Sequence, residues 1–188
     1  MNQLKTKMSR EVLILLDSDV VIHLFKADKI SLLNELFPGR VRMLDVVLEE
    51  LLKNRSVRNV VENLFTYKQI EEITFPTTSN QQLFQEFIEL KSTITGTGER
   101  ACLVYCKHYQ NIIASSNTTD IIPYCNAHGI AFLTTLDILS IAMERHLISE
   151  TEINTHIKKI TKNNESYLCC DTIAEHRKVH FDRHKLLY

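Results

Sequence analysis

The sequence has few glycines and prolines, almost no net charge and no long apolar run. Only four glycines and three prolines occur in 188 residues, so their positions indicate boundaries between elements. Lysine plus arginine nearly balance aspartate plus glutamate, 22 against 23, which excludes a general polyanion binder. The longest aliphatic run, residues 12–16, is far shorter than the ~18 residues of a membrane span. We therefore expect no membrane partner.

Cysteine motifs are also scarce. The five cysteines include no C-x-x-C pair, as expected for reduced thiols in a reducing compartment. The spacing of Cys102, Cys106 and His108 suits one face of a buried helix better than a zinc site. The apolar run at residues 12–16 is also too short for a signal-peptide core of roughly 7–15 residues. These features predict a cytoplasmic protein.

What the chain does contain is an alternation of short apolar strands and helical patterns. Four apolar runs begin near Val12, Val41, Asn111 and Ile130, and each is followed by a helical pattern. A further short strand is expected at residues 70–75. This alternation predicts an α/β fold, a three-layer sandwich with helices on both faces of a mainly parallel central sheet.

The helix ends and the C-terminal part carry their own signals. Asp45 is expected to cap a helix over residues 46–53, and Gly129 to end a helix over residues 121–127. We predict a main domain over residues 1–148 and a helical extension over residues 149–188 packed on it. The extension carries three isoleucines at helical spacing and the most basic segment of the chain. Those residues are Ile153, Ile157 and Ile160, and then the basic groups His176, Arg177 and Lys178 and Arg183, His184 and Lys185.

Acidic residues follow several of the predicted strands. Asp17 and Asp19 follow the first strand, Glu50 lies on the helix after the second, Glu99 begins a later helix, and Asp120 follows the third strand. Each acid alone is better explained as a helix cap or a solvated residue. Together they fall at the edge of a parallel sheet where ligands bind, and such crowded carboxylates suit Mg²⁺ or Mn²⁺. We expect one acidic pocket in which crowding raises at least one pKa.

These segments also carry a family resemblance. The stretches LDSDVVI (residues 16–22), VVLEEL (46–51), GERA (98–101) and SSNTTDI (115–121) follow the order seen in PIN-domain nucleases. Residues 129–139 resemble the strand and helix that end this domain. The chain from Val12 to Ile148 thus resembles a PIN-domain nuclease. It departs from the family at Asn117 and Thr118, where other members have two aspartates.

The resemblance implies a metal-dependent endoribonuclease that hydrolyses RNA phosphodiester bonds. Its metal ligands for Mg²⁺ or Mn²⁺ are then Asp17, Glu99 and Asp120. Glu50 completes the catalytic set by binding a water of the cation shell or orienting the attacking water, while Glu49 faces solvent. Toxin-type members of the family further imply an antitoxin protein as partner, and a homodimer is also expected.

The resemblance assigns the remaining polar residues of these motifs to supporting roles. Ser18, Ser116 and Asn117 are expected to contact substrate. Asp19 is expected to have a secondary role as an outer ligand or cap, so that Asp19→Asn keeps more activity than Asp17→Asn.

Two other functions fit part of the pattern. The Asp17-Ser18-Asp19 motif also resembles the first motif of haloacid-dehalogenase-type phosphatases, although this leaves Glu50 and Glu99 unused. Such enzymes need a later lysine and acidic pair, for which the chain offers only Lys158, Lys159 and the isolated Asp171. A PIN-like scaffold that binds RNA or protein without cutting is the other alternative, favoured by the departure at Asn117.

Overall fold

The computed structural model of the chain describes residues 12–162 and 166–180, so the basic segment at residues 183–185 lies outside it. The described strands form one sheet in the order β3-β2-β1-β4-β5, and every neighbouring pair is parallel. These strands are β1 (Ile14–Leu16), β2 (Val41–Leu44), β3 (Glu71–Ile73), β4 (Ile112–Ala114) and β5 (Phe132–Leu133). The predicted α/β fold with a parallel sheet is confirmed.

Strand composition follows position in the sheet. The central strands β1 and β4 are wholly apolar and buried, as strands covered on both faces require. The edge strand β3 instead carries Glu71 and Glu72, both exposed. Charged side chains on an edge strand discourage pairing with another chain. Glu71 also forms an ion pair with Arg42 of β2, with 2.8 Å between Nη2 and Oε2.

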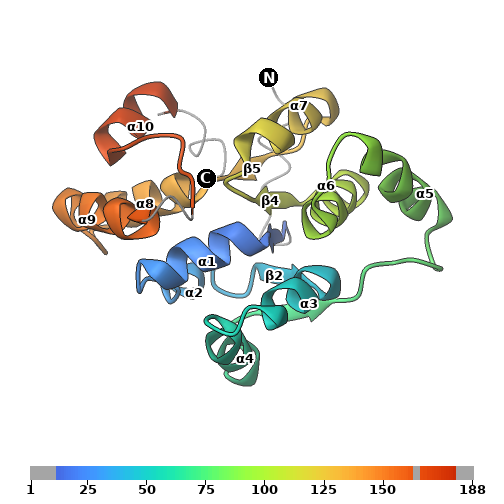
Figure 1. Cartoon of the computed structure of the whole chain (residues 1–188), viewed down its shortest axis with the longest axis horizontal. Coiled ribbons are helices and arrows are strands. Elements are labelled where there is room, and N and C mark those ends of the chain that lie inside the picture. Colours follow the sequence, from blue (N-terminus) through green and yellow to red (C-terminus); the bar gives the residue numbers. More distant parts are fainter. Residues whose placement is uncertain (1–11, 163–165, 181–188) are drawn as a thin grey trace.

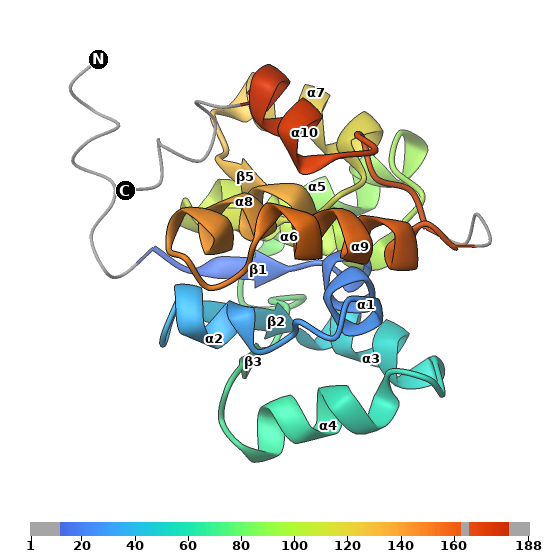
Figure 2. The same cartoon turned by 90° about the vertical axis from the view of Figure 1, so that its left-hand side faces the viewer.

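The helices form the two outer layers of the sandwich. Helices α1, α2 and α8 cover one face of the sheet, whereas α5, α6 and α7 cover the other (Figures 1 and 2). Helix α3 contacts both α1 and α6. The helical segments are α1 (Ser18–Lys26), α2 (Leu32–Leu36), α3 (Asp45–Lys53), α4 (Arg58–Thr66), α5 (Gln81–Glu89), η2 (Leu90–Ser92), α6 (Thr97–Tyr109), α7 (Thr118–His128), α8 (Thr135–Glu144), α9 (Glu150–Ile160) and α10 (Ile173–His180).

One of the two predicted helix ends is confirmed and the other is wrong. Gly129 ends α7 in the left-handed conformation at φ 65°, which glycine adopts without steric cost. Asp45 is instead the first residue of α3, and Leu44 is its N-cap. The Asp45 carboxylate accepts hydrogen bonds from the backbone N–H groups of Val46 (2.8 Å) and Phe75 (3.0 Å). It therefore ties the start of α3 to the segment after β3.

The C-terminal extension packs on the face formed by α1 and α8. Helix α9 contacts α1, and α10 contacts both α8 and α9 (Figure 2). The three isoleucines predicted to face the domain are buried in α9. Cys102 and Cys106 are buried within α6, as their helical spacing indicates. Among residues 12–162 and 166–180, no helix combines the length and apolar character needed to cross a membrane.

Candidate active site

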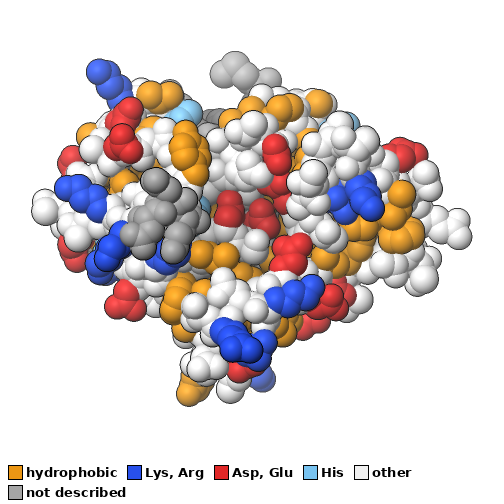
Figure 3. Space-filling view, viewed as in Figure 1, with side chains coloured by type: hydrophobic (Ala, Val, Ile, Leu, Met, Phe, Trp, Pro, Cys, Tyr) orange, Lys and Arg blue, Asp and Glu red, His pale blue; other side chains and the backbone are white. Residues whose placement is uncertain are grey.

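An acidic pocket of about 190 Å³ lies beyond the carboxyl end of β1. Figure 3 shows acidic side chains gathered near the centre of the face seen in Figure 1, between α1, α3 and α6. The residues that line the pocket are Asp17, Ser18, Asp19, Glu50, Gly96, Glu99 and Asn117. The fold thus brings together residues from four separate parts of the chain.

The junction between β1 and α1 places the two aspartates. The backbone N–H of Asp17 donates to the carbonyl of Ala114 at 2.9 Å, so Asp17 continues the sheet ladder. Its buried carboxylate caps α1 by accepting from the N–H of Ser18 at 2.7 Å. Asp19 Oδ2 accepts from the N–H of Ser116 at 2.7 Å, whereas Asp19 Oδ1 is buried without a hydrogen-bond partner in the described ranges.

A glycine holds Glu50 against the start of α6. Glu50 Oε1 accepts a hydrogen bond from the N–H of Gly98 at 3.0 Å. A Cβ atom at position 98 would lie 2.8 Å from Glu50 Oε2 and 3.0 Å from a methyl of Val47, so only glycine permits this approach. The neighbouring Glu49 is exposed, in agreement with the expected division between the two glutamates.

An asparagine joins the last two acids. Glu99 is buried in the first turn of α6, and its Oε2 accepts from Asn117 Nδ2 at 3.3 Å. The same amide nitrogen donates to Asp120 Oδ2 at 3.0 Å. Asp120 does not line the pocket, so it lies one hydrogen bond away at the rim. Glu99 Oε1 is buried and has no hydrogen-bond partner among the residues described.

The pocket strongly disfavours three ionised carboxylates at once. Burial is the largest cause that raises the pKa of Asp17, and the charge of Asp19 adds to it. Burial also raises the pKa of Asp19, against the opposing backbone hydrogen bond from Ser116. Burial, then the charges of Asp17 and Asp120, raises the pKa of Glu99 to about 8. The expected rise is present, but burial contributes more to it than crowding does.

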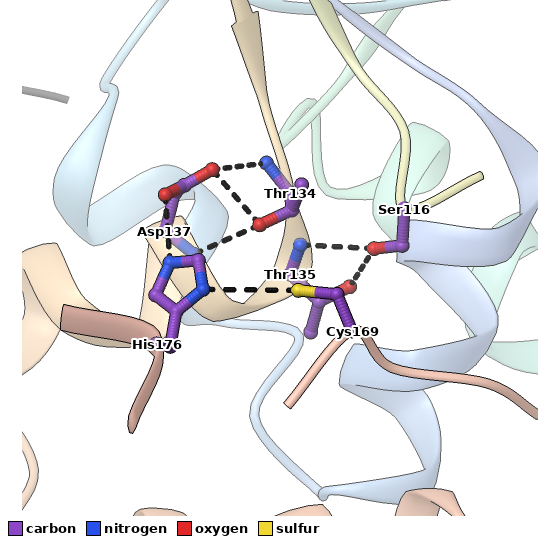
Figure 4. A network of polar contacts seen from close by, with 6 residues as sticks. All are labelled: Ser116, Thr134, Thr135, Asp137, Cys169 and His176. Carbon is purple, nitrogen blue, oxygen red and sulfur yellow. Dashed lines mark hydrogen bonds and ion pairs between the residues drawn. The ribbon is translucent and has the colours of Figure 1, made fainter. Parts of the chain in front are cut away.

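The hydroxyl of Ser116, a predicted substrate contact, is engaged by hydrogen bonds within the fold. This hydroxyl lies 2.9 Å from Thr135 Oγ1 and accepts from the Thr135 N–H at 3.0 Å (Figure 4). Thr135 Oγ1 also lies 3.0 Å from Nδ1 of the buried His23. The Ser116 side chain therefore joins β4 to α8, and its backbone rather than its hydroxyl serves the pocket. Ser18 lines the pocket as expected.

A second cavity of about 290 Å³ adjoins the acidic pocket and shares Asp19 and Asn117 with it. Tyr167, whose exposed fraction is 74%, lies at this cavity together with Ser166. Lys26 of α1 donates to Ser166 Oγ at 3.0 Å and so fixes this segment against the domain. No local sequence signal points to Tyr167, because it lies far along the chain from Asp19.

The donor atoms of the pocket are of the type that hard divalent cations prefer. Its acids offer only carboxylate oxygens, and two of these oxygens are buried without partners in the described part of the chain. Oxygen ligands of this kind suit Mg²⁺ or Mn²⁺. No model of a known protein family matches the chain, and no curated protein does. The fold and the side chains therefore carry the functional argument.

Proposed function

We propose that this chain is a metal-dependent endoribonuclease that hydrolyses RNA phosphodiester bonds in the acidic pocket. The supporting observation is that Asp19 Oδ1 and Glu99 Oε1, both buried beside Asp17, lack partners within the described residues. A buried polar atom without a partner is destabilising, and most such atoms in proteins are satisfied by protein, water or ions. A cation bound between these carboxylates would supply the partner.

The residues of the pocket divide the work of hydrolysis. Asp17, Asp19 and Glu99 would hold the cation, whereas Asp120 would act from the rim through its hydrogen bond to Asn117. When bound, such an ion lowers the pKa of a water molecule and stabilises charge on the scissile phosphate. Glu50, fixed by the Gly98 N–H, is placed to orient the attacking water. Asn117 acts as a positioning residue, since its amide holds Glu99 and Asp120 at a fixed separation.

Single-stranded RNA is the substrate class that the surroundings favour. The cavity beside the acids ends at the exposed ring of Tyr167, and bases of single strands stack on aromatic rings. Lys53 and Arg55 are exposed at the end of α3, the helix that carries Glu50, where they can contact phosphates. Arg58 instead donates to the Leu52 carbonyl at 2.8 Å through Nε and so supports the fold.

The proposal extends to partners. The resemblance to toxin-type PIN-domain nucleases supports an antitoxin protein that blocks the acidic pocket, and a homodimer. A small DNA-binding protein encoded by the neighbouring reading frame would favour the toxin role.

The positions of the lysines do not favour the phosphatase alternative. Lys159 lines a different cavity, together with Asp28 and His156. No lysine is among the residues that line the acidic pocket in the described part of the chain. Hydrolysis of a monoester by this chain would therefore lack the lysine that phosphatases of that type require.

The decisive experiment compares two variants on two substrates. Wild type, Asp17→Asn and the control Asp28→Asn are incubated with a labelled single-stranded RNA and with a small phosphate monoester, in Mg²⁺, Mn²⁺ or chelator. Asp28 is exposed and has a left-handed backbone, φ 58°, that asparagine also tolerates. We expect metal-dependent RNA cleavage that falls by ~100-fold or more in Asp17→Asn and persists in Asp28→Asn.

Other outcomes contradict the nuclease in distinguishable ways. Turnover of the monoester with intact RNA would identify a phosphatase. RNA binding without cleavage of either substrate would identify a binding scaffold. Cleavage that survives the chelator would exclude the metal-dependent mechanism.

A further inference from the structure

A second cluster of metal-binding side chains lies around α10, in the C-terminal extension. Cys169, Cys170, His176 and His180 each offer one ligand atom, and these four atoms all lie within 4.8 Å of one another. Cys170 and His176 are buried, and the other two side chains are half-buried. We propose that these four residues bind one Zn²⁺ ion, at a site separate from the acidic pocket.

Local structure brings the four side chains together. The cysteine pair lies in the segment just before α10, and the two histidines lie four residues apart on that helix. Side chains at positions i and i+4 share one face of a helix, and the two imidazole rings are 5.0 Å apart between centroids. The turn before the helix therefore folds the thiols back toward the face that carries both histidines.

The measured separations suit a tetrahedral metal site. Zinc bonds of about 2.3 Å to sulfur and about 2.0–2.1 Å to nitrogen place tetrahedral S and N ligands about 3.6 Å apart. The distance between Cys169 Sγ and His176 Nδ1 is 3.8 Å (Figure 4). The remaining pairs, at up to 4.8 Å, need only small side-chain movements to close on an ion.

An aspartate outside the cluster orients one of the ligands. His176 Nε2 lies 2.8 Å from Asp137 Oδ1, and both side chains are buried. A carboxylate accepts hydrogen bonds, so Nε2 carries the proton and the lone pair of Nδ1 faces Cys169. Asp137 is itself fixed, because its Oδ2 accepts from the N–H (2.7 Å) and hydroxyl (2.8 Å) of Thr134. Metal-binding histidines typically have such a carboxylate partner.

The donor types select the metal and its role. Two thiolates and two imidazoles favour Zn²⁺ over the Mg²⁺ or Mn²⁺ proposed for the acidic pocket. Four protein ligands leave no open position for substrate, so the site is structural. Helix α10 has eight residues, and Ile173 is its buried aliphatic side chain within the described residues. Helices this short are marginal alone, and a metal supplies the missing anchor.

The test measures metal content and cobalt spectra of the full-length chain. The protein is purified without a histidine tag under a non-chelating reductant, and bound metals are quantified by mass spectrometry. We expect one zinc per chain. After removal of zinc, Co²⁺ should produce the thiolate charge-transfer and d–d bands of a tetrahedral site. In buffer that already contains saturating Mg²⁺, Zn²⁺ should then raise the melting temperature of the metal-free protein further.

Matched variants separate ligand loss from misfolding. His180→Gln and Cys169→Ser remove ligands that are only half-buried, whereas the controls His128→Gln and Cys125→Ala remove a histidine and a thiol outside the cluster. Loss of an outer partner typically weakens metal affinity by about 10- to 100-fold, and we expect each ligand variant to exceed this. Both controls should bind Co²⁺ like wild type.

Three results would overturn the zinc site. The first is wild-type protein that holds no zinc and shows no thiolate band with Co²⁺. The second is equal Co²⁺ affinity in the ligand variants and in the controls. The third is a Cys169–Cys170 disulfide, found by mass spectrometry of the protein as it is made in cells. None of these results bears on RNA cleavage, so the nuclease proposal is tested separately.

Discussion

Asp19 is the residue whose role changes most between sequence and structure. Its position two residues after the strand indicates an outer ligand or cap. In the folded chain, one of its carboxylate oxygens is fixed by the Ser116 N–H and the other is buried without a partner in the described residues. Asp120, assigned to the metal from the family resemblance, instead lies at the rim. We therefore expect Asp19, rather than Asp120, to be a ligand of the cation.

This assignment predicts a rank order of activities. Asp19→Asn should lower metal-dependent RNA cleavage by ~100-fold or more, like Asp17→Asn, because a bound ion contributes several kcal/mol of charge stabilisation. Asp120→Asn should cost only about tenfold, as for a residue outside the ligand set. Single-turnover rates at saturating Mg²⁺ measure both. A smaller loss in Asp19→Asn than in Asp120→Asn would restore the assignment made from the sequence.

Tyr167 is the residue that we expect to contact a base of the substrate. Stacking on an aromatic ring is worth about 1–3 kcal/mol per base, so Tyr167→Ala should raise KM for single-stranded RNA by about 5- to 100-fold. The rate at saturating RNA should change little, because the ring lies outside the acidic pocket. Tyr67→Ala is the matched control, since the ring of Tyr67 is 72% exposed beyond the end of α4. Equal KM values for the two variants would exclude the stacking contact.

At the scale of elements, the approach of α3 to α6 completes the pocket. Helix α3 carries Glu50, and the start of α6 contributes both the Gly98 N–H and Glu99. A side chain at position 98 would collide with the Glu50 carboxylate and with Val47 of α3. The geometry of the acidic pocket thus depends on a contact between helices that are far apart in the sequence.

Replacing this glycine should reduce activity more than stability. In Gly98→Ala the new methyl displaces the flexible Glu50 carboxylate, and misplacement of a catalytic group by about 1 Å can cost on the order of 100-fold in rate. Gly96→Ala is the comparison, because its Cβ adds a methyl to the same pocket at an ordinary 3.4 Å from Glu99 Cβ and meets no atom of Glu50. RNA cleavage and urea unfolding are measured for both variants. A Gly98→Ala protein with wild-type activity would remove Glu50 from the mechanism.

At the scale of the whole molecule, a single glutamate connects three helices of one outer layer. Glu86 of α5 contacts Lys107 and His108 of α6 and the hydroxyl of Tyr124 in α7. Burial opposes ionisation of Glu86, but the hydrogen bonds from Lys107, Tyr124 and His108 outweigh it and lower the pKa to about 2. The ionised form is therefore the form that the folded state stabilises.

This lowered pKa predicts how stability depends on pH. Its contribution to the free energy of unfolding is complete above the ordinary value of 4.5 and is lost as the pH falls toward about 2. Glu86→Gln should cost about 1.5–3 kcal/mol at pH 7, the range for hydrogen bonds to charged groups. Urea unfolding should show this difference from wild type shrinking in acid. The exposed Glu89→Gln should show no such trend. A pH-independent difference would mean that Glu86 acts through packing alone.

The sequence by itself determined the class of fold and most of its elements. Runs such as residues 41–44 and 112–114 indicate buried strands, because they are short, mostly apolar and followed by helical patterns. The order of the elements then favours a parallel sheet, and parallel strands bring Asp17 and Asn117 to one edge. The division between Glu49 and Glu50, which the family resemblance implies, agrees with the exposed side chain of Glu49 and the half-buried one of Glu50.

Only the tertiary structure decided which polar atoms meet across the sheet and its extension. The Ser116 hydroxyl accepts a hydrogen bond from Thr135 of α8, and Asp19 rather than Asp120 lines the pocket. His176 reaches Asp137 only after α10 folds onto α8. Local sequence patterns indicate which residues share a face of one helix or strand. They do not record the distances between elements, which depend on the packing of the whole chain.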